Sequence, residues 1–177
     1  MSGSISNAMG PPLSQIIPPS INIAPPIEKS TNEPLKLFSE KQGNCIVAML
    51  YPMLTVSEAN GGQKTSVKKG NKTIFKSEHW SEKNHRHKKQ KAMVALMLRK
   101  FRSDFKIPCL ITLTRYAPNK LDRHDNLPMS MKWILDAVCE IITGDYRPGR
   151  ADDNEEIDVK YRQIFSKEYA VKIEVSF

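Results

Sequence analysis

The sequence predicts an α+β fold, in which two main helices pack on a single mixed β-sheet. In this chain of 177 residues, short apolar runs of strand length alternate with longer apolar stripes of helical period. Their order is strand, helix, strand, helix, strand, strand, which favours one sheet with helices packed on it. No run reaches the roughly 18 apolar residues of a membrane span. We therefore expect a soluble protein without membrane contact. Its amino terminus lacks the basic segment, apolar stretch and cleavage site of a secretion signal, so we expect it in the cytoplasm.

The chain divides into a tail and one domain. Residues 1–36 hold seven of the 12 prolines, among them three Pro-Pro pairs spaced seven residues apart. Such a segment cannot bury enough surface to fold alone, so we expect a disordered tail with partial polyproline-II character. It acts either as a docking peptide for a partner or as a spacer. Residues 37–177 form the expected domain.

In the first half of this domain, the sequence predicts one strand, then a basic segment and then one helix. A continuous apolar run over Asn44–Tyr51 stops at Pro52, as in a strand buried on both faces. Residues Ser57–Lys76 carry five lysines and little apolar content, which indicates a long basic loop or an extended hairpin. The segment Ser81–Phe101 lacks proline and glycine and has an apolar stripe near its end, so we expect a helix.

The second half predicts a strand, a helix and two further strands. Pro108–Tyr116 is the strand, and Leu127–Thr143 is the helix, with Gly144 at its end. Apolar and charged residues then alternate over Ile157–Arg162 and Tyr169–Phe177. This period of two predicts half-buried antiparallel strands joined to each other near Ser166–Glu168.

The charge balance points to a polyanionic partner. The formal net charge is +8, and the stretch from Lys83 to Arg102 holds eight basic residues without any acid. We expect the amino-terminal part of this helix to bind nucleic acid. The expected contacts are His79, Trp80, Lys83, Arg86, Lys88, Lys89 and Lys91.

Individual side chains of this region leave alternatives open. Trp80 either stacks on a base beside His79 or anchors the start of the helix in the core. His85 and His87 have no cysteine partners for zinc, and we expect them to add pH-sensitive charge to the basic face.

Acidic residues flank the second helix on both sides. Asp122 and Asp125 precede it, whereas Asp152 and Asp153 follow it. Asp125 suits the cap of the helix, where the helix dipole keeps a carboxylate ionised, and the later pair suits a solvated turn. Alternatively, converging carboxylates would bind Mg²⁺, which is held by one or two carboxylates plus substrate phosphate. Such a metal would polarise a phosphodiester and generate the attacking hydroxide.

The whole arrangement resembles the RusA family of Holliday-junction resolvases, especially its phage and prophage branch. The resemblance covers roughly residues 45–177. The residues that carry it are Lys120–Leu127 after a strand, Ile134–Val138 within the following helix, Asp152-Asp153, and Tyr161-Arg162-Gln163 in a later strand.

The resemblance implies a Mg²⁺-dependent endonuclease that acts as a homodimer and nicks two symmetric strands of a four-way DNA junction. The metal ligands of the family fall on Asp122 and Asp125, and on Asp152 or Asp153. Two residues separate the first two acids, where the family usually has one. Met129 stands where some members have a lysine. Lys132 is the nearest substitute as a catalytic residue, although pairing with Asp136 is its simpler role.

Two other functions compete with this resolvase. One is a catalytically inactive DNA-binding protein of the same fold, which lost catalysis because of the altered spacing of the acids. The other is an interaction module recruited through the proline-rich tail.

Overall fold

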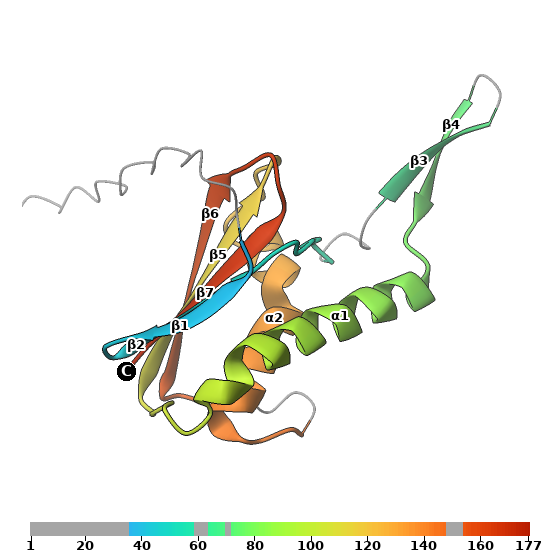
Figure 1. Ribbon diagram of the computed structural model, residues 1–177. Helices are drawn as coiled ribbons and strands as arrows, with labels where there is room; N and C mark the ends of the chain where they lie inside the picture. The colour runs from blue at the N-terminus through green and yellow to red at the C-terminus, as the bar shows by residue number, and fades with distance from the viewer. Residues whose placement is uncertain (1–35, 59–63, 70–71, 148–153) are drawn as a thin grey trace, which may run out of the picture.

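The computed structural model describes residues 36–58, 64–69, 72–147 and 154–177, and of residues 64–77 the backbone only (Figure 1). The expected tail, residues 1–36, therefore lies almost wholly outside the described residues. The described chain confirms the predicted α+β fold, with one mixed five-stranded sheet and two main helices.

The sheet joins strands from both ends of the domain. Only β5 and β6 run parallel, and the other neighbouring pairs are antiparallel. In spatial order the strands are β1 (Phe38–Gln42), β2 (Cys45–Leu50), β7 (Ala170–Ser176), β5 (Cys109–Ala117) and β6 (Ile157–Phe165). Strands β7 and β5 are thus central, and β6 is an edge.

The predicted pairing of the last two strands is wrong. β5 lies between β6 and β7, so these two strands do not bond to each other. The second helix is a crossover that returns the chain to the start of β5, which forces β6 to run parallel to β5. Alternation alone could not reveal this, because an edge strand such as β6 shows it as well as a hairpin strand does.

The described chain contains one strand that was not predicted, β1. The structure also decides the form of the basic segment, which the sequence left open as a loop or a hairpin. β1 precedes β2 through a two-residue turn in which Gly43 has φ +58°, a left-handed value suited to glycine. This Gly-Asn turn was the signal for the missed strand. The basic segment is a hairpin, formed by β3 (Lys64–Lys69) and β4 (Lys72–Ser77), and not a loop.

Two helices cover one face of the sheet (Figure 1). They are α1 (Trp80–Leu98), which continues into a short 3₁₀ turn at Arg99–Phe101, and α2 (Asn126–Thr143). The core lies between them and the alternate sheet residues that face them. Its largest fully buried apolar side chains are Ile46, Leu50, Val94, Leu98, Ile111, Leu113, Leu127, Met131, Ile134, Val138 and Ile173.

Within the described part of the chain, no helix combines the length and apolar character that crossing a membrane requires.

Candidate functional site

The loop before α2 carries the acidic motif and is held by two polar side chains of the sheet. We call residues 118–125 the motif loop. The side-chain amide of Gln163 donates to the Leu121 carbonyl at 2.7 Å and accepts from the Leu121 N–H at 2.9 Å. Arg115, with 4 % of its surface exposed, donates to the Asn119 carbonyl at 2.6 Å. The motif loop is therefore fixed to β5 and β6 just before Asp122.

The carboxylate of Asp122, and not that of Asp125, bonds the backbone N–H groups at the start of α2. One oxygen of the Asp122 carboxylate accepts from the backbone N–H of His124 at 3.2 Å. The other accepts from the N–H groups of Asp125 and Asn126 at 3.2 and 3.3 Å. These hydrogen bonds hold the pKa of Asp122 below its ordinary value. Asp125 occupies the N-cap position as predicted, but the expected capping by its side chain is wrong, because that side chain makes no capping bond.

The two motif acids are both exposed to solvent. Asp152 and Asp153, the other expected ligands, lie outside the described residues. Asn154, which follows them, precedes the amino-terminal end of β6, whereas Asp122 follows the carboxyl-terminal end of the parallel strand β5. In the described chain, no three His, Cys, Asp or Glu side chains are grouped as a metal would require.

Lys132 makes the simpler of its two expected contacts. Its ammonium lies 3.6 Å from the Asp136 carboxylate, one helical turn further along α2. The structure leaves its predicted catalytic role as a prediction.

A connecting segment, residues 53–58, lies between the motif loop and α1. Thr55 accepts a hydrogen bond from the Arg115 guanidinium at 2.9 Å, and Ser57 donates to the Asn126 side chain at 2.6 Å. The next residue, Glu58, bonds to side chains of α1. Two adjacent residues thus join the first residue of α2, directly after the motif loop, to the basic helix α1.

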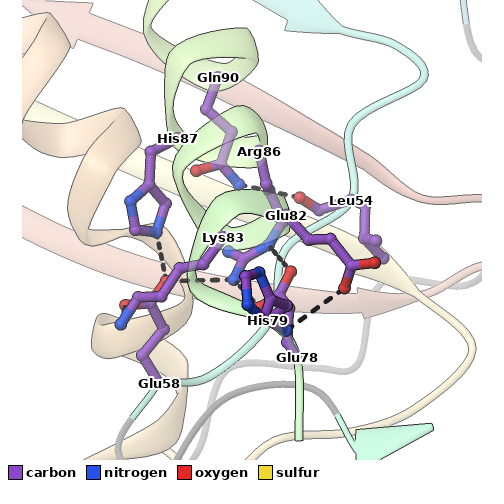
Figure 2. Close-up of polar contacts among 9 residues, drawn as sticks. All are labelled: Leu54, Glu58, Glu78, His79, Glu82, Lys83, Arg86, His87 and Gln90. Carbon is purple, nitrogen blue, oxygen red and sulfur yellow. Dashed lines mark hydrogen bonds and ion pairs between the residues drawn. The ribbon is translucent and has the colours of Figure 1, made fainter.

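Glu58 is the centre of an ion cluster at the start of α1 (Figure 2). Lys83 lies 2.7 Å and Arg86 3.2 Å from its carboxylate, and His87 bonds to it as well. Arg86 also makes a two-pronged bond to Glu78, at 3.1 and 2.6 Å. We call these five residues the Glu58 cluster. Burial raises the pKa of Glu58, but the bonds from Lys83 and His87 outweigh burial and hold the pKa below its ordinary value.

Three of the expected DNA contacts are engaged within the protein. Acids from outside α1 neutralise them: Glu58 and Glu78 pair with Lys83 and Arg86, and Glu140 of α2 lies 2.5 Å from Lys91. The absence of acids between Lys83 and Arg102 therefore overstated the free charge of the helix. Lys88 and Lys89 are exposed.

The aromatic and histidine side chains of α1 separate into two groups. Trp80 is 69 % exposed, so the alternative that it anchors the helix in the core is wrong. His79 caps α1 together with Glu82, and its ring centroid lies 5.8 Å from that of Trp80. His87 is buried and stacks on Trp133 of α2 at 4.1 Å, so it does not lie on an exposed basic face as predicted.

Sequence reasoning missed Arg115, Glu58 and Glu78. Arg115 had a signal, since it occupies the inward position of an otherwise apolar strand, where a cation needs several partners. The two glutamates had none, because their role depends on Arg86 meeting both of them in space.

Comparison with protein-family models and with curated proteins gives no match for this chain.

Proposed function

We propose that this protein is a Mg²⁺-dependent, structure-selective DNA endonuclease of the RusA type, which resolves four-way junctions by symmetric nicking as a homodimer in the cytoplasm. One observation supports it above the others. The resemblance-bearing acids Asp122 and Asp125 lie exposed on a loop that the sheet fixes, and Ser57 and Glu58 join Asn126, the next residue after this loop, to the basic helix α1.

The orientation of the helices also supports the proposal. His87 contacts Trp133, and one turn further along α1, Lys91 contacts Glu140, which lies further along α2. Both helices therefore run in the same sense, and their amino-terminal parts lie at the same end of the pair. This places Lys88, Lys89 and Trp80 in the half of α1 toward the motif loop. Phosphate-binding side chains next to carboxylates are what a metal-dependent nuclease requires.

The two motif acids can supply part of the ligands of one Mg²⁺ ion. Mg²⁺ is held by one or two carboxylates together with water and substrate phosphate, and Asp122 and Asp125 supply two exposed carboxylates. Asp122 has one oxygen that accepts only a single backbone bond and keeps lone pairs for a metal. The cation would supply Lewis acidity at the scissile phosphate, while the α2 amino terminus favours the phosphate itself.

The capping by Asp122 also supports the second candidate, a catalytically inactive DNA-binding protein. A carboxylate that accepts three backbone N–H groups is fully explained as a helix cap. In this case the basic surface would bind DNA without metal, and Asp125 would only repel phosphate.

Cleavage of labelled DNA separates the two candidates. The substrates are a synthetic four-way junction and a linear duplex of matching sequence, each with Mg²⁺ or EDTA. The proposed nuclease nicks the junction symmetrically, spares the duplex and is inactive in EDTA. Asp125→Asn removes cleavage but retains junction binding.

Asp158→Asn is the matched control. Asp158 is an exposed aspartate near the amino-terminal end of β6, whereas the motif loop is held near the carboxyl-terminal end of this strand. We expect it to cleave like the wild type. Tight junction binding by the wild type without any nick in Mg²⁺, together with unchanged or tighter binding by Asp125→Asn, would replace the nuclease by the inactive DNA-binding protein.

A further inference from the structure

The β3–β4 hairpin projects from the body of the protein, past the amino-terminal end of α1 (Figure 1). Its two strands bond to each other and do not join the five-stranded sheet. An isolated two-stranded hairpin is marginally stable at best in water. This arrangement is therefore unfavourable unless a partner contributes to it.

The register of the hairpin places three of its five described lysines on one face, and the other two, Lys64 and Lys68, on the opposite face. The directly opposite pairs Lys69–Lys72 and Thr65–Lys76 share a face with Val67 and Ile74, because alternate residues of a strand belong to the same face. The described hairpin residues include five lysines and no acid. Like charges directly opposite each other destabilise a strand pair. A polyanion that neutralises Lys69 and Lys72 would remove this repulsion.

One guanidinium of α1, that of Arg86, bonds both glutamates that flank the hairpin in the chain. Glu58 precedes the hairpin in the chain and Glu78 follows it directly. Arg86 donates to both glutamates, at 3.2 and 2.6 Å, and its side chain is largely buried (Figure 2). The described residues that flank the hairpin in the chain, Glu58 and Glu78, are thus both held at the amino-terminal part of α1.

We propose that the β3–β4 hairpin is a second DNA-binding arm, which contacts a double-stranded arm of the substrate through the face bearing Lys69, Lys72 and Lys76. The proposal rests on the proposed DNA substrate, and it adds a contact outside α1 and the motif loop. Arg86 acts as the positioning residue of the arm.

The dimensions and composition of the hairpin favour duplex DNA over a membrane surface. A two-stranded ribbon fits the major groove, which is about 12 Å wide, and six residues extend about 20 Å along it. Its apolar residues, Val67, Ile74 and Phe75, are divided between the two faces. Neither face therefore offers the continuous apolar surface that a membrane-bound segment needs.

The test is binding in EDTA, measured by fluorescence anisotropy with a labelled four-way junction and a linear duplex over a range of salt concentrations. The variant replaces Lys69, Lys72 and Lys76 with Gln. The control replaces three exposed lysines elsewhere, Lys106, Lys160 and Lys167, with Gln, so that both variants lose the same charge.

We expect the hairpin variant to bind both DNAs about tenfold more weakly than the control or worse. Its salt dependence should be shallower by about 0.9 for each phosphate that the hairpin no longer neutralises. Equal binding by the two variants would overturn the proposal. Both variants are also mixed with phosphatidylcholine vesicles containing phosphatidylserine. If the hairpin variant retains DNA binding but loses vesicle binding, this result would also overturn the proposal. Since EDTA prevents metal-dependent cleavage, this result is independent of the nuclease test, and either proposal can fail alone.

Discussion

At the scale of single residues, the most consequential side chain near the motif is Arg115. It is a cation placed among apolar residues of the central strand β5, and burial lowers the pKa of its guanidinium. The residue remains charged at neutral pH, because a guanidinium is not deprotonated in proteins. Its bonds to Thr55 and to the Asn119 carbonyl join the connecting segment to the motif loop.

Replacing Arg115 with Met tests this role. The substitution retains much of the side-chain volume but leaves the Asn119 carbonyl and the Thr55 hydroxyl without their donor. We expect a loss of roughly 1–3 kcal/mol in the free energy of unfolding, measured by urea denaturation. A Lys160→Met variant, at an exposed position of the edge strand β6, should unfold like the wild type. Equal stability of Arg115→Met and the wild type would show that the buried guanidinium does not hold the loop.

Asp122 offers a second residue-scale prediction, because capping and metal binding have different chemical requirements. Asparagine caps helices about as well as aspartate, whereas alanine does not. We expect Asp122→Ala to lower the Tm by about 2–4 °C and Asp122→Asn to leave it nearly unchanged. Thermal unfolding followed by circular dichroism measures both.

The same two variants inform on the proposed nuclease. If Asp122 is a metal ligand, Asp122→Asn loses cleavage although it keeps the cap. Full cleavage by a well-folded Asp122→Asn variant would leave Asp122 with the capping role alone.

At the scale of elements, part of the positive charge of α1 is neutralised by glutamates that lie outside this helix. Its basic side chains meet glutamates from the connecting segment, from the end of β4 and from α2. This organises the amino-terminal half of the helix around Glu58. The exposed lysines and Trp80 remain on the surface for a partner.

The Glu58 cluster predicts a specific dependence of stability on pH. The folded-state pKa of Glu58 lies below its ordinary value of 4.5, so the carboxylate stabilises the fold above that pH. This stabilisation is lost as the pH falls through the lowered pKa. We expect Glu58→Gln to have a lower Tm than the wild type at pH 7, and the difference between them to shrink below about pH 4.5.

Thermal melts of both proteins between pH 7 and pH 3 measure this effect. Glu155→Gln, which removes an exposed glutamate in the turn before β6, outside the Glu58 cluster, should follow the wild type at every pH. A Tm difference between Glu58→Gln and the wild type that stays constant over this range would contradict an ionic role for Glu58.

At the scale of the whole molecule, local periodicity was enough to predict four of the five strands of the sheet, both helices and the end of α2 at Gly144. It failed where the outcome depends on distant segments. The position of β5 between β6 and β7 follows from the crossover through α2, and the neutralisation of Lys83, Arg86 and Lys91 follows from tertiary packing. For the candidate site, sequence predicted the exposed acids but not the choice of Asp122 as the cap, since both aspartates suit that position chemically.

The proposed substrate has a further consequence at this scale. A four-way junction presents two scissile phosphates related by a two-fold axis, so symmetric nicking requires two copies of the chain with the same symmetry. We expect sedimentation equilibrium to give about twice the monomer mass at the concentrations at which junctions are cleaved. Monomeric mass with symmetric cleavage would contradict the homodimer.

The closure of the β3–β4 hairpin by Arg86 also defines a site for protein engineering. Glu58 and Glu78 flank the hairpin in the chain, and one guanidinium bonds both glutamates. An excursion with its ends fixed in this way is a modular insertion, since the entropy of closing a loop depends only weakly on its length. A short turn or an unrelated small domain inserted between Glu58 and Glu78 should leave the five-stranded sheet and the motif loop intact. The fold can thus accept new recognition modules at this position.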